Sequence, residues 1–272
     1  MNILAAHVRG FWRLRQHFEN PFLITLLRLG FIKLKYFPHA MRNGRNSYLM
    51  LGRPTSTTGA DLFVMREVLI EETYRDLLPL LPLLPRKGLR LVDIGANLGS
   101  FTIWLSQAAK VDEAFCFEPE LDSFQLLRFN LANNGCGFAH ALDQAVGGRS
   151  RTAQITLNES KPGVTDIYST APGRPEGKSI KVVAFSEWLQ QTPGAFDLLK
   201  LDCEGAEWEI VRKTSPSELA RFGAVVAEVH DDPEKSQTVK EFLALMEAAG
   251  FRTVPSAPGL YLGVRRQPAA VG

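Results

Sequence analysis

A loop that contains two glycines, Asp93-Ile94-Gly95-Ala96-Asn97-Leu98-Gly99, joins an apolar strand-like run to a helix-like run that opens at Ser100. A strand, a glycine loop and a helix in this order can hold a nucleoside cofactor. In dinucleotide-binding loops a glycine stands two positions after the first one, because the pyrophosphate approaches the backbone there. This chain has Asn97 at that position, and its side chain would crowd a pyrophosphate. We therefore expect a cofactor without phosphates, such as S-adenosylmethionine, to be held by the following loop residues: Asp93, Gly95, Ala96, Asn97 and Gly99.

Carboxylates follow the next two predicted strands. Glu118 stands nineteen positions beyond Gly99, near the roughly 20-residue offset at which an acid binds the ribose in such units. A carboxylate can accept from both ribose hydroxyls, which a neutral side chain does less well. Asp143 follows the third strand, where it could accept from the adenine amino group. The alternatives are a solvated strand end or helix cap for Glu118, and a surface turn for Asp143.

The densest group of ionisable residues follows the fourth predicted strand, in the block from Lys200 to Glu207. Strand alternation sends Lys200 and Asp202 to one face of the sheet. A lysine inside a buried strand must be paired or lose its charge, and Asp202 is the nearest partner. Glu204 and Glu207 cluster just beyond. The alternative is a structural ion-pair network with helix caps.

The fifth predicted strand ends at His230, with Glu228 on the same side. His230 is the only one of five histidines at such a strand end. Its ordinary pKa range suits a general base. A structural histidine with satisfied hydrogen bonds is the alternative.

These residues need a scaffold of alternating strands and helices, and the chain has this alternation from residue 89 onward. Strands are predicted at 89–93, 113–118, 137–142, 152–158, 180–184, 196–202 and 223–230, with a terminal antiparallel pair within 253–264. Helices are predicted at 100–109, 121–134, 185–190, 206–213 and 235–249. The alternation predicts a parallel sheet with helices on both faces, whose ligands bind at the carboxyl ends of the strands.

Upstream of this pattern, residues 1–60 form a predicted extension of a domain that spans residues 61–272. Residues 1–45 contain eight Lys or Arg residues against a single acid, Glu19, interleaved with apolar side chains. This pattern is typical of two basic amphipathic helices, which would either contact an anionic membrane surface or cap the main domain. Short strands are predicted from residue 46 onward, followed by a helix from Arg66 to Leu78 that is ended by the prolines at 79, 82 and 85.

The overall composition narrows the class of protein. A chain of 272 residues can bury one large core, and a net charge of +2 with 22% charged residues lacks the basicity of a nucleic-acid binder. The spacing of Cys116, Cys136 and Cys203 indicates neither disulfides nor a zinc site. No apolar run of eighteen residues and no signal peptide is recognised. We expect a cytoplasmic protein, with peripheral contact at the inner face of the membrane as an option, and no sequence feature indicates its oligomeric state.

Together, these blocks resemble the FkbM family of S-adenosylmethionine-dependent methyltransferases. The resemblance covers residues 62–252 and rests on five stretches in the family's order: 91–99, 117–119, 145–147, 199–207 and 228–230. The Lys-x-Asp-x-Glu-Gly-x-Glu block at 200–207 is its most specific element. Cys203 stands where an aliphatic residue is commoner in the family, and residues 1–45 match nothing family-wide.

The resemblance implies a class I methyltransferase fold, which is a Rossmann-like, seven-stranded, mostly parallel sheet with helices on both faces. It also implies O-methylation of a small molecule or saccharide, including natural products, glycans and lipid-linked sugars. We predict His230 or Asp202 as the base, with Glu204, Glu228 and Lys200 as the other candidate catalytic residues. Asp202 is also a candidate cofactor-binding residue. If a metal takes part, the oxygen ligands Asp202, Glu204 and Glu228 would suit Mg²⁺ better than zinc.

Three rival functions remain open at this stage. A NAD-type oxidoreductase would share the sheet, but the missing second glycine argues against it. A nucleic-acid methyltransferase would need a basic groove, whereas the run after the fourth strand is acidic. A non-catalytic methyltransferase-like protein would bind the cofactor without turnover.

Overall fold

The structure is a computed structural model of the 272-residue chain. It describes residues 16–28, 34–53, 60–84, 87–157, 165–168, 178–203, 205–231 and 237–265.

A seven-stranded sheet forms the centre of the molecule, in the order β12-β13-β11-β10-β3-β4-β5. Its strands are β3 (Leu89–Ile94), β4 (Val111–Phe117), β5 (Ala139–Leu142), β10 (Phe196–Leu201), β11 (Phe222–Glu228), β12 (Phe251–Pro255) and β13 (Leu260–Arg265). Neighbouring strands from β5 to β11 are parallel, whereas β13 runs antiparallel to β11 and β12. The predicted terminal antiparallel pair is confirmed.

The strand order reverses between β3 and β10. From β3 the chain proceeds outward to β4 and β5, and it then crosses to the other side of β3 to form β10. Both central strands are apolar runs that are buried along most of their length, as expected where helices cover both faces of a parallel sheet. Ligands of such sheets bind at the carboxyl ends beside this reversal point, which is where the predicted site residues stand.

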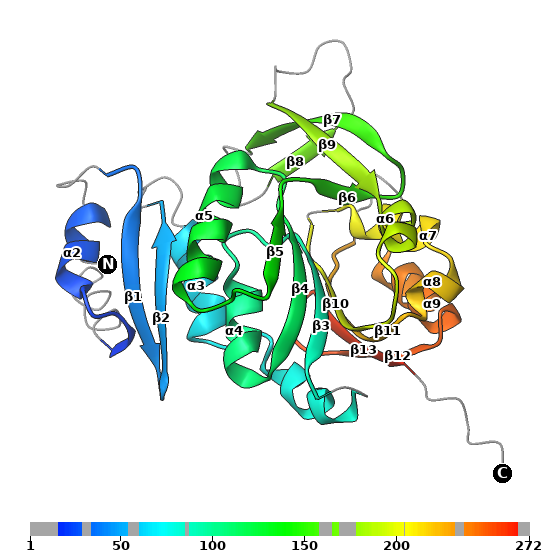
Figure 1. The fold of residues 1–272 in the computed structure, drawn as a ribbon, viewed down its shortest axis with the longest axis horizontal. Helices are drawn as coiled ribbons and strands as arrows, with labels where there is room; N and C mark the ends of the chain where they lie inside the picture. Colours follow the sequence, from blue (N-terminus) through cyan, green and yellow to red (C-terminus); the bar gives the residue numbers. More distant parts are fainter. Residues whose placement is uncertain are drawn as a thin grey trace.

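Helices cover both faces of the sheet (Figure 1). On one side lie α3 (Ala60–Leu69), α4 (Ser100–Ala108) and α5 (Leu121–Asn133), and on the other lie α6 (Phe185–Gln191), α7 (Glu207–Lys213), α8 (Pro216–Leu219) and α9 (Val239–Ala248). Each side has its own cluster of buried apolar side chains. The predicted fold class, a Rossmann-like seven-stranded mostly parallel sheet with helices on both faces, is confirmed.

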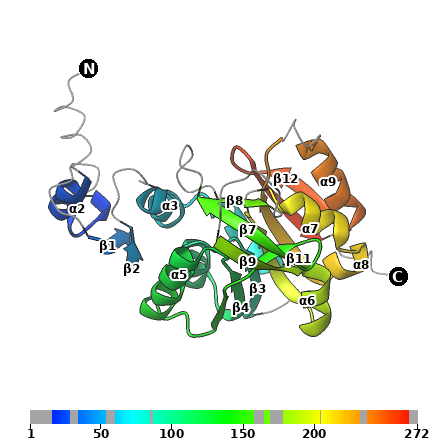
Figure 2. The ribbon, with the colours of Figure 1, turned by 90° about the horizontal axis from the view of Figure 1, so that it is seen from above.

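A second sheet lies beyond the carboxyl end of β5 (Figures 1 and 2). It has the order β6-β9-β7-β8, formed by β6 (Ala145–Gly147), β7 (Arg151–Leu157), β8 (Thr165–Tyr168) and β9 (Lys178–Ala184). The strands predicted at 152–158 and 180–184 are therefore present, but they pair with each other outside the main sheet.

The N-terminal segment differs from the pair of helices predicted over residues 1–45, whereas a strand lies directly after residue 45, where short strands were predicted. After α2 (Pro21–Arg28) the chain forms an antiparallel hairpin of β1 (Phe37–Asn43) and β2 (Asn46–Gly52). Burial alternates along both strands, so that His39 and Met50 face inward and Leu49 faces outward. Because the buried side chains alternate with exposed ones, a strand places all of them on one face against the protein. A helix over these residues would spread the same side chains around its axis. Residues 1–15 and 29–33 lie outside the described part of the chain.

Two asparagines of α5 attach the hairpin to the main domain. Asn130 accepts from the backbone N–H of Leu51 and donates to its carbonyl, at 2.6 and 3.1 Å. Asn134 makes the same pair of bonds with Leu49, at 3.0 and 2.9 Å. Since these side chains are about one helical turn apart, they satisfy alternate backbone groups along β2 much as a neighbouring strand would.

The helix predicted from Arg66 to Leu78 is wrong in its extent. Helix α3 ends at Leu69, and Glu72 then takes a left-handed conformation with φ of 54°, which breaks an α-helix. A 3₁₀ helix, Arg75–Leu83, follows and contains Pro79 and Pro82 instead of ending before them. Proline's fixed φ is compatible with successive 3₁₀ turns.

The structure also bears on membrane spanning and on the cysteines. None of the described helices is long and apolar enough to cross a membrane. Cys116, Cys136 and Cys203 are free thiols, and the first two are buried.

Candidate functional site

The glycine loop packs directly on the end of β10. The backbone N–H of Asp202 donates to the carbonyl of Ile94 at 3.1 Å. Gly95 has a φ of +80°, and a Cβ at this position would lie only 1.7 Å from the carbonyl oxygen of Asp202. On the other side, the N–H groups of Gly95 and Ala96 donate to the carbonyl of Phe117, where β4 ends. The loop is therefore fixed between the ends of two strands.

Glu118 is tied to this loop through its carboxylate. One oxygen accepts from the backbone N–H of Asn97 at 2.9 Å, and the other accepts from that of Glu120 at 2.8 Å. The side chain is buried. Burial raises the pKa of Glu118 to about 7 and outweighs the two backbone hydrogen bonds, which lower it. The spacing of Glu118 from Gly99 predicts that this carboxylate lies at the loop, and the structure brings the two together.

Two polar side chains lie beneath the loop. Asp93 is fully buried and accepts from the hydroxyl of Thr102 at 2.7 Å, so it braces the start of α4. Ser100, the first residue of α4, is also buried, and its hydroxyl has no hydrogen-bond partner in the described part of the chain. A buried hydroxyl without a partner is costly, which makes Ser100 a candidate ligand contact that the sequence did not indicate.

Lys200 joins the cofactor loop to the end of its own strand. Its ammonium donates to the carbonyl of Gly95 at 2.7 Å and lies 3.0 Å from Asp202 and 3.4 Å from Asp93. Burial alone would lower the pKa of Lys200, but the two carboxylates raise it well above its ordinary value, so the ammonium stays charged. The pairing with Asp202 expected from strand alternation is confirmed.

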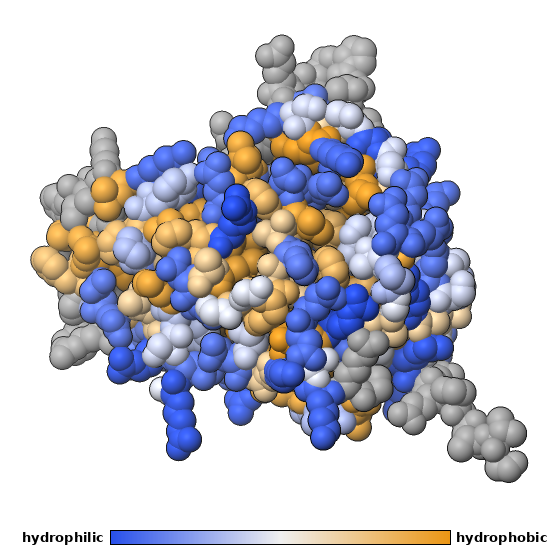
Figure 3. Space-filling model, in the orientation of Figure 1, coloured by the Kyte–Doolittle hydropathy of each residue, from blue (hydrophilic) through white to orange (hydrophobic). Residues whose placement is uncertain are grey.

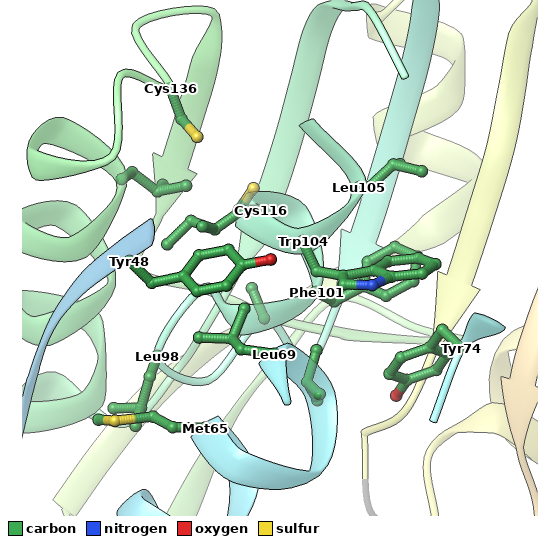
Figure 4. Packing of buried hydrophobic residues seen from close by; sticks show 14 of the residues in the cluster. Tyr48, Met65, Leu69, Tyr74, Leu98, Phe101, Trp104, Leu105, Cys116 and Cys136 are labelled. Atoms are coloured by element: carbon green, nitrogen blue, oxygen red, sulfur yellow. The ribbon is translucent and has the colours of Figure 1, made fainter. Parts of the chain in front are cut away.

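Tyr74 is a residue of this site that sequence reasoning missed. Its hydroxyl lies 3.5 Å from the same Asp202 oxygen that contacts Lys200. The ring packs edge-on against Phe101 and beside Trp104 (Figure 4). Burial, reinforced by Asp202, raises the pKa of Tyr74 well above its ordinary value, so the hydroxyl keeps its proton and donates. Asp202 itself retains 30% exposure of its side chain.

Helix α3 adds a further carboxylate near Asp202. Burial raises the pKa of Glu67, and the charges of Glu71 and Asp202 add to this effect. The charge of Asp202 therefore acts on a helix that lies upstream of the glycine loop in the chain.

The other residues of the acidic block have different positions. Glu207 is buried and accepts from the backbone N–H groups of Cys203 and Gly205 at 2.6 and 2.8 Å, so it braces the loop after β10. Glu204 lies outside the described residues. Asp143 follows β5 and is exposed.

His230 and Glu228 lie together, as strand alternation predicts, at 3.9 Å. The histidine is 68% exposed. Its ring lies against Gly259, since a Cβ there would be 2.5 Å from its Nε2 atom. Among the described residues, no group of three or more His, Cys, Asp or Glu side chains is arranged to hold a metal ion.

This arrangement has two connected parts, a loop with a buried carboxylate and an acidic surface centred on Asp202. A family model described as the methyltransferase FkbM domain matches residues 93–253, more than half of the chain. The chain belongs to the FkbM methyltransferase family. The FkbM match contains the glycine loop, Glu118, Lys200, Asp202 and His230, whereas Tyr74 lies before it.

Two curated relatives agree with the FkbM assignment. Methyltransferase 1 of Beauveria bassiana is 24% identical over 215 residues, covering 72% of this chain and 83% of the relative. The 31-O-demethyl-FK506 methyltransferase FkbM of Streptomyces tacrolimicus is 25% identical over 236 residues, covering 75% and 87%. A solved FkbM methyltransferase from Methylobacillus flagellatus aligns with a TM-score of 0.46 and 14% identity, over 65% of this chain. The aligned part of this chain spans 44% of that structure's length.

Proposed function

We propose that this protein transfers a methyl group from S-adenosylmethionine to a hydroxyl of a small molecule or saccharide. The observation that carries the proposal is the single unit formed by the glycine loop, Lys200 and Asp202. It joins a nucleoside-type cradle to a carboxylate that is partly open to an acceptor. The name of the Streptomyces relative describes methylation of an oxygen, which supports a hydroxyl as the acceptor.

The loop residues fit the proposed cofactor. A carboxylate offers about four lone-pair sites, and the two backbone bonds to Glu118 leave capacity for two ribose hydroxyls. A cofactor hydroxyl that donates to a buried carboxylate also favours its ionised form. The unpartnered hydroxyl of Ser100 at the start of α4 offers a further polar contact. When bound, S-adenosylmethionine supplies an electrophilic methyl group on a sulfonium.

On the acceptor side, we assign the main role to Asp202. Lys200 and Tyr74 both hold one of its oxygens, so the carboxylate has a fixed orientation toward a hydroxyl that approaches it. An oxygen that gains a methyl group becomes positively charged, and a nearby carboxylate can then accept its proton. Correct positioning can contribute roughly 7 to 11 kcal/mol in favourable cases. His230, which is much more exposed, is the second candidate for the base.

A role for Mg²⁺ in orienting the acceptor stays a prediction. Of its three candidate ligands, Glu204 lies outside the described residues. Turnover measured after chelation and after readdition of Mg²⁺ decides the matter, because equal rates would discard a required metal.

Calorimetry with S-adenosylmethionine tests the cofactor assignment. Wild type should bind and Glu118→Ala should bind at least tenfold more weakly, since each lost charge-assisted hydrogen bond costs about 1.5 to 3 kcal/mol. Equal affinities would refute the ribose role of Glu118. Transfer of a radiolabelled methyl group to a panel of hydroxylated acceptors then separates an enzyme from a non-catalytic relative. Binding of a nicotinamide cofactor in place of S-adenosylmethionine would favour the oxidoreductase.

A further inference from the structure

The outward face of the β1–β2 hairpin carries apolar side chains. Its inward face is filled by buried residues such as Met41 and Met50, whereas Pro38 and Leu49 point to the other side and are exposed. Leu49 is 42% exposed. This face is therefore partly open to solvent at Leu49.

The apolar surface continues from the hairpin onto α5. Asn130 and Asn134 hold α5 along β2, and Tyr36 and Lys35, just before β1, contact Asp122 of α5 at 3.4 and 3.8 Å. Phe129 lies two helical turns beyond Asp122, so both are on the same side of α5.

Leu34 is 48% exposed and Phe129 is 44% exposed. Apolar side chains gather over the hairpin and α5 in Figure 3, on the left of the view. We call Leu34, Pro38, Leu49 and Phe129 the hairpin face.

Exposed cations lie on the hairpin and on α5. Lys35, Arg42, Arg45 and Arg128 are all exposed, and they come from the segment before the hairpin, from β1, from the turn after β1 and from α5. Two acids lie among them, and each is engaged: Glu19 pairs with Arg42 at 3.0 Å, and Asp122 contacts Lys35. These four cations outnumber the two acids that they contact, although the chain as a whole carries a charge of only +2.

We propose that the hairpin face docks on an anionic membrane surface. Exposed leucine and phenylalanine side chains gain by entering the boundary between headgroups and acyl chains, and surrounding arginines and lysines complement lipid phosphates. The charge around the face favours this occupant over a second copy of the chain, since two such faces would bring like charges together. Docking of this kind does not depend on the methyltransferase activity.

Vesicle flotation of the full chain tests the proposal. The two probes are phosphatidylcholine vesicles and phosphatidylcholine vesicles with about one third phosphatidylglycerol. Wild type should float with the anionic vesicles and not with the neutral ones, and salt should release it because screening weakens surface attraction. Leu49→Glu with Phe129→Glu, and separately Arg45→Glu with Arg128→Glu, should each lower partitioning at least about tenfold, since each cation near the surface is worth about fivefold.

The control variants are Leu83→Glu and Lys110→Glu, which alter exposed residues away from the hairpin face and should float like wild type. Equal partitioning onto neutral vesicles, no flotation of wild type, or full retention by both test variants would overturn the proposal. Light scattering tests the rival occupant, a second copy of the chain. If wild type is a dimer and the double variant Leu49→Glu with Phe129→Glu is a monomer, the hairpin face binds a second copy and not a membrane. Circular dichroism of each variant verifies that these exposed substitutions leave the fold intact.

Discussion

The ammonium of Lys200 lies 2.7 Å from the carbonyl oxygen of Gly95, although the two residues are 105 positions apart in the chain. This bond, with the ion pairs to Asp93 and Asp202, fixes the cofactor loop and the acceptor-side carboxylate relative to each other. A shift of either part would therefore disturb the other.

Replacing Lys200 with methionine should destabilise the protein by about 3 to 5 kcal/mol, because removing one partner leaves buried carboxylates uncompensated. The matched control is Lys110→Met, which removes an exposed ion pair with Asp112 and should change the free energy of unfolding by less than about 1 kcal/mol. Urea denaturation measures both. Equal effects of the two substitutions would contradict a central role for Lys200.

Gly95→Ala should abolish binding of S-adenosylmethionine, because the new Cβ would overlap the carbonyl of Asp202. Gly135→Ala is the control, since Gly135 has a similar φ of +74° and a Cβ added there would meet no atom within 4 Å. Both variants carry the strain of a left-handed backbone, about 1 to 2 kcal/mol, so only Gly95→Ala adds the overlap. Calorimetry should show wild-type affinity for Gly135→Ala, and normal binding by Gly95→Ala would rule out this geometry.

Tyr74→Phe removes the hydroxyl that holds Asp202 and should lower kcat by about fivefold, the equivalent of about 1 kcal/mol for one hydrogen bond. Affinity for S-adenosylmethionine should change little. Tyr48→Phe is the control, because the buried Tyr48 hydroxyl, which has Asn46 nearby, makes no hydrogen bond of good geometry to the described residues, and its removal should be close to neutral. If both variants had the same kcat as wild type, Tyr74 would have no role in positioning Asp202.

Glu118 should make stability depend on pH. Its pKa is about 7 in the folded protein against about 4.3 when unfolded, so folding favours the protonated form. This contribution is complete below about pH 4.3 and is lost as pH rises through 7, a change of about 4 kcal/mol for a shift of this size. Glu118→Gln should flatten the profile and raise stability relative to wild type as pH increases. If the free energies of unfolding of wild type and Glu118→Gln changed in parallel from about pH 4 to 8, the raised pKa of Glu118 would be contradicted.

The sequence predicts contacts of the site best where the two residues lie in one strand or in one strand-loop-helix unit. Alternation along a single strand was enough to pair Lys200 with Asp202, and the known geometry of strand-loop-helix units brought Glu118 to the loop. Tyr74 had no such signal, because it meets Asp202 only through the packing of a segment 128 positions away. The first strand of the hairpin was mistaken for part of a helix, since its basic and aromatic composition hid the period of two at Phe37, His39 and Met41, whereas short strands were predicted from residue 46 onward.

The asparagine contacts along β2 have a consequence for solubility. Open strand edges recruit strands from other molecules and seed aggregation. Here Asn130 and Asn134 occupy the outer edge of β2, and a bridge between Phe18 and Met41 occupies part of the β1 edge. The hairpin can thus expose apolar side chains to a surface while its backbone offers little to a foreign strand.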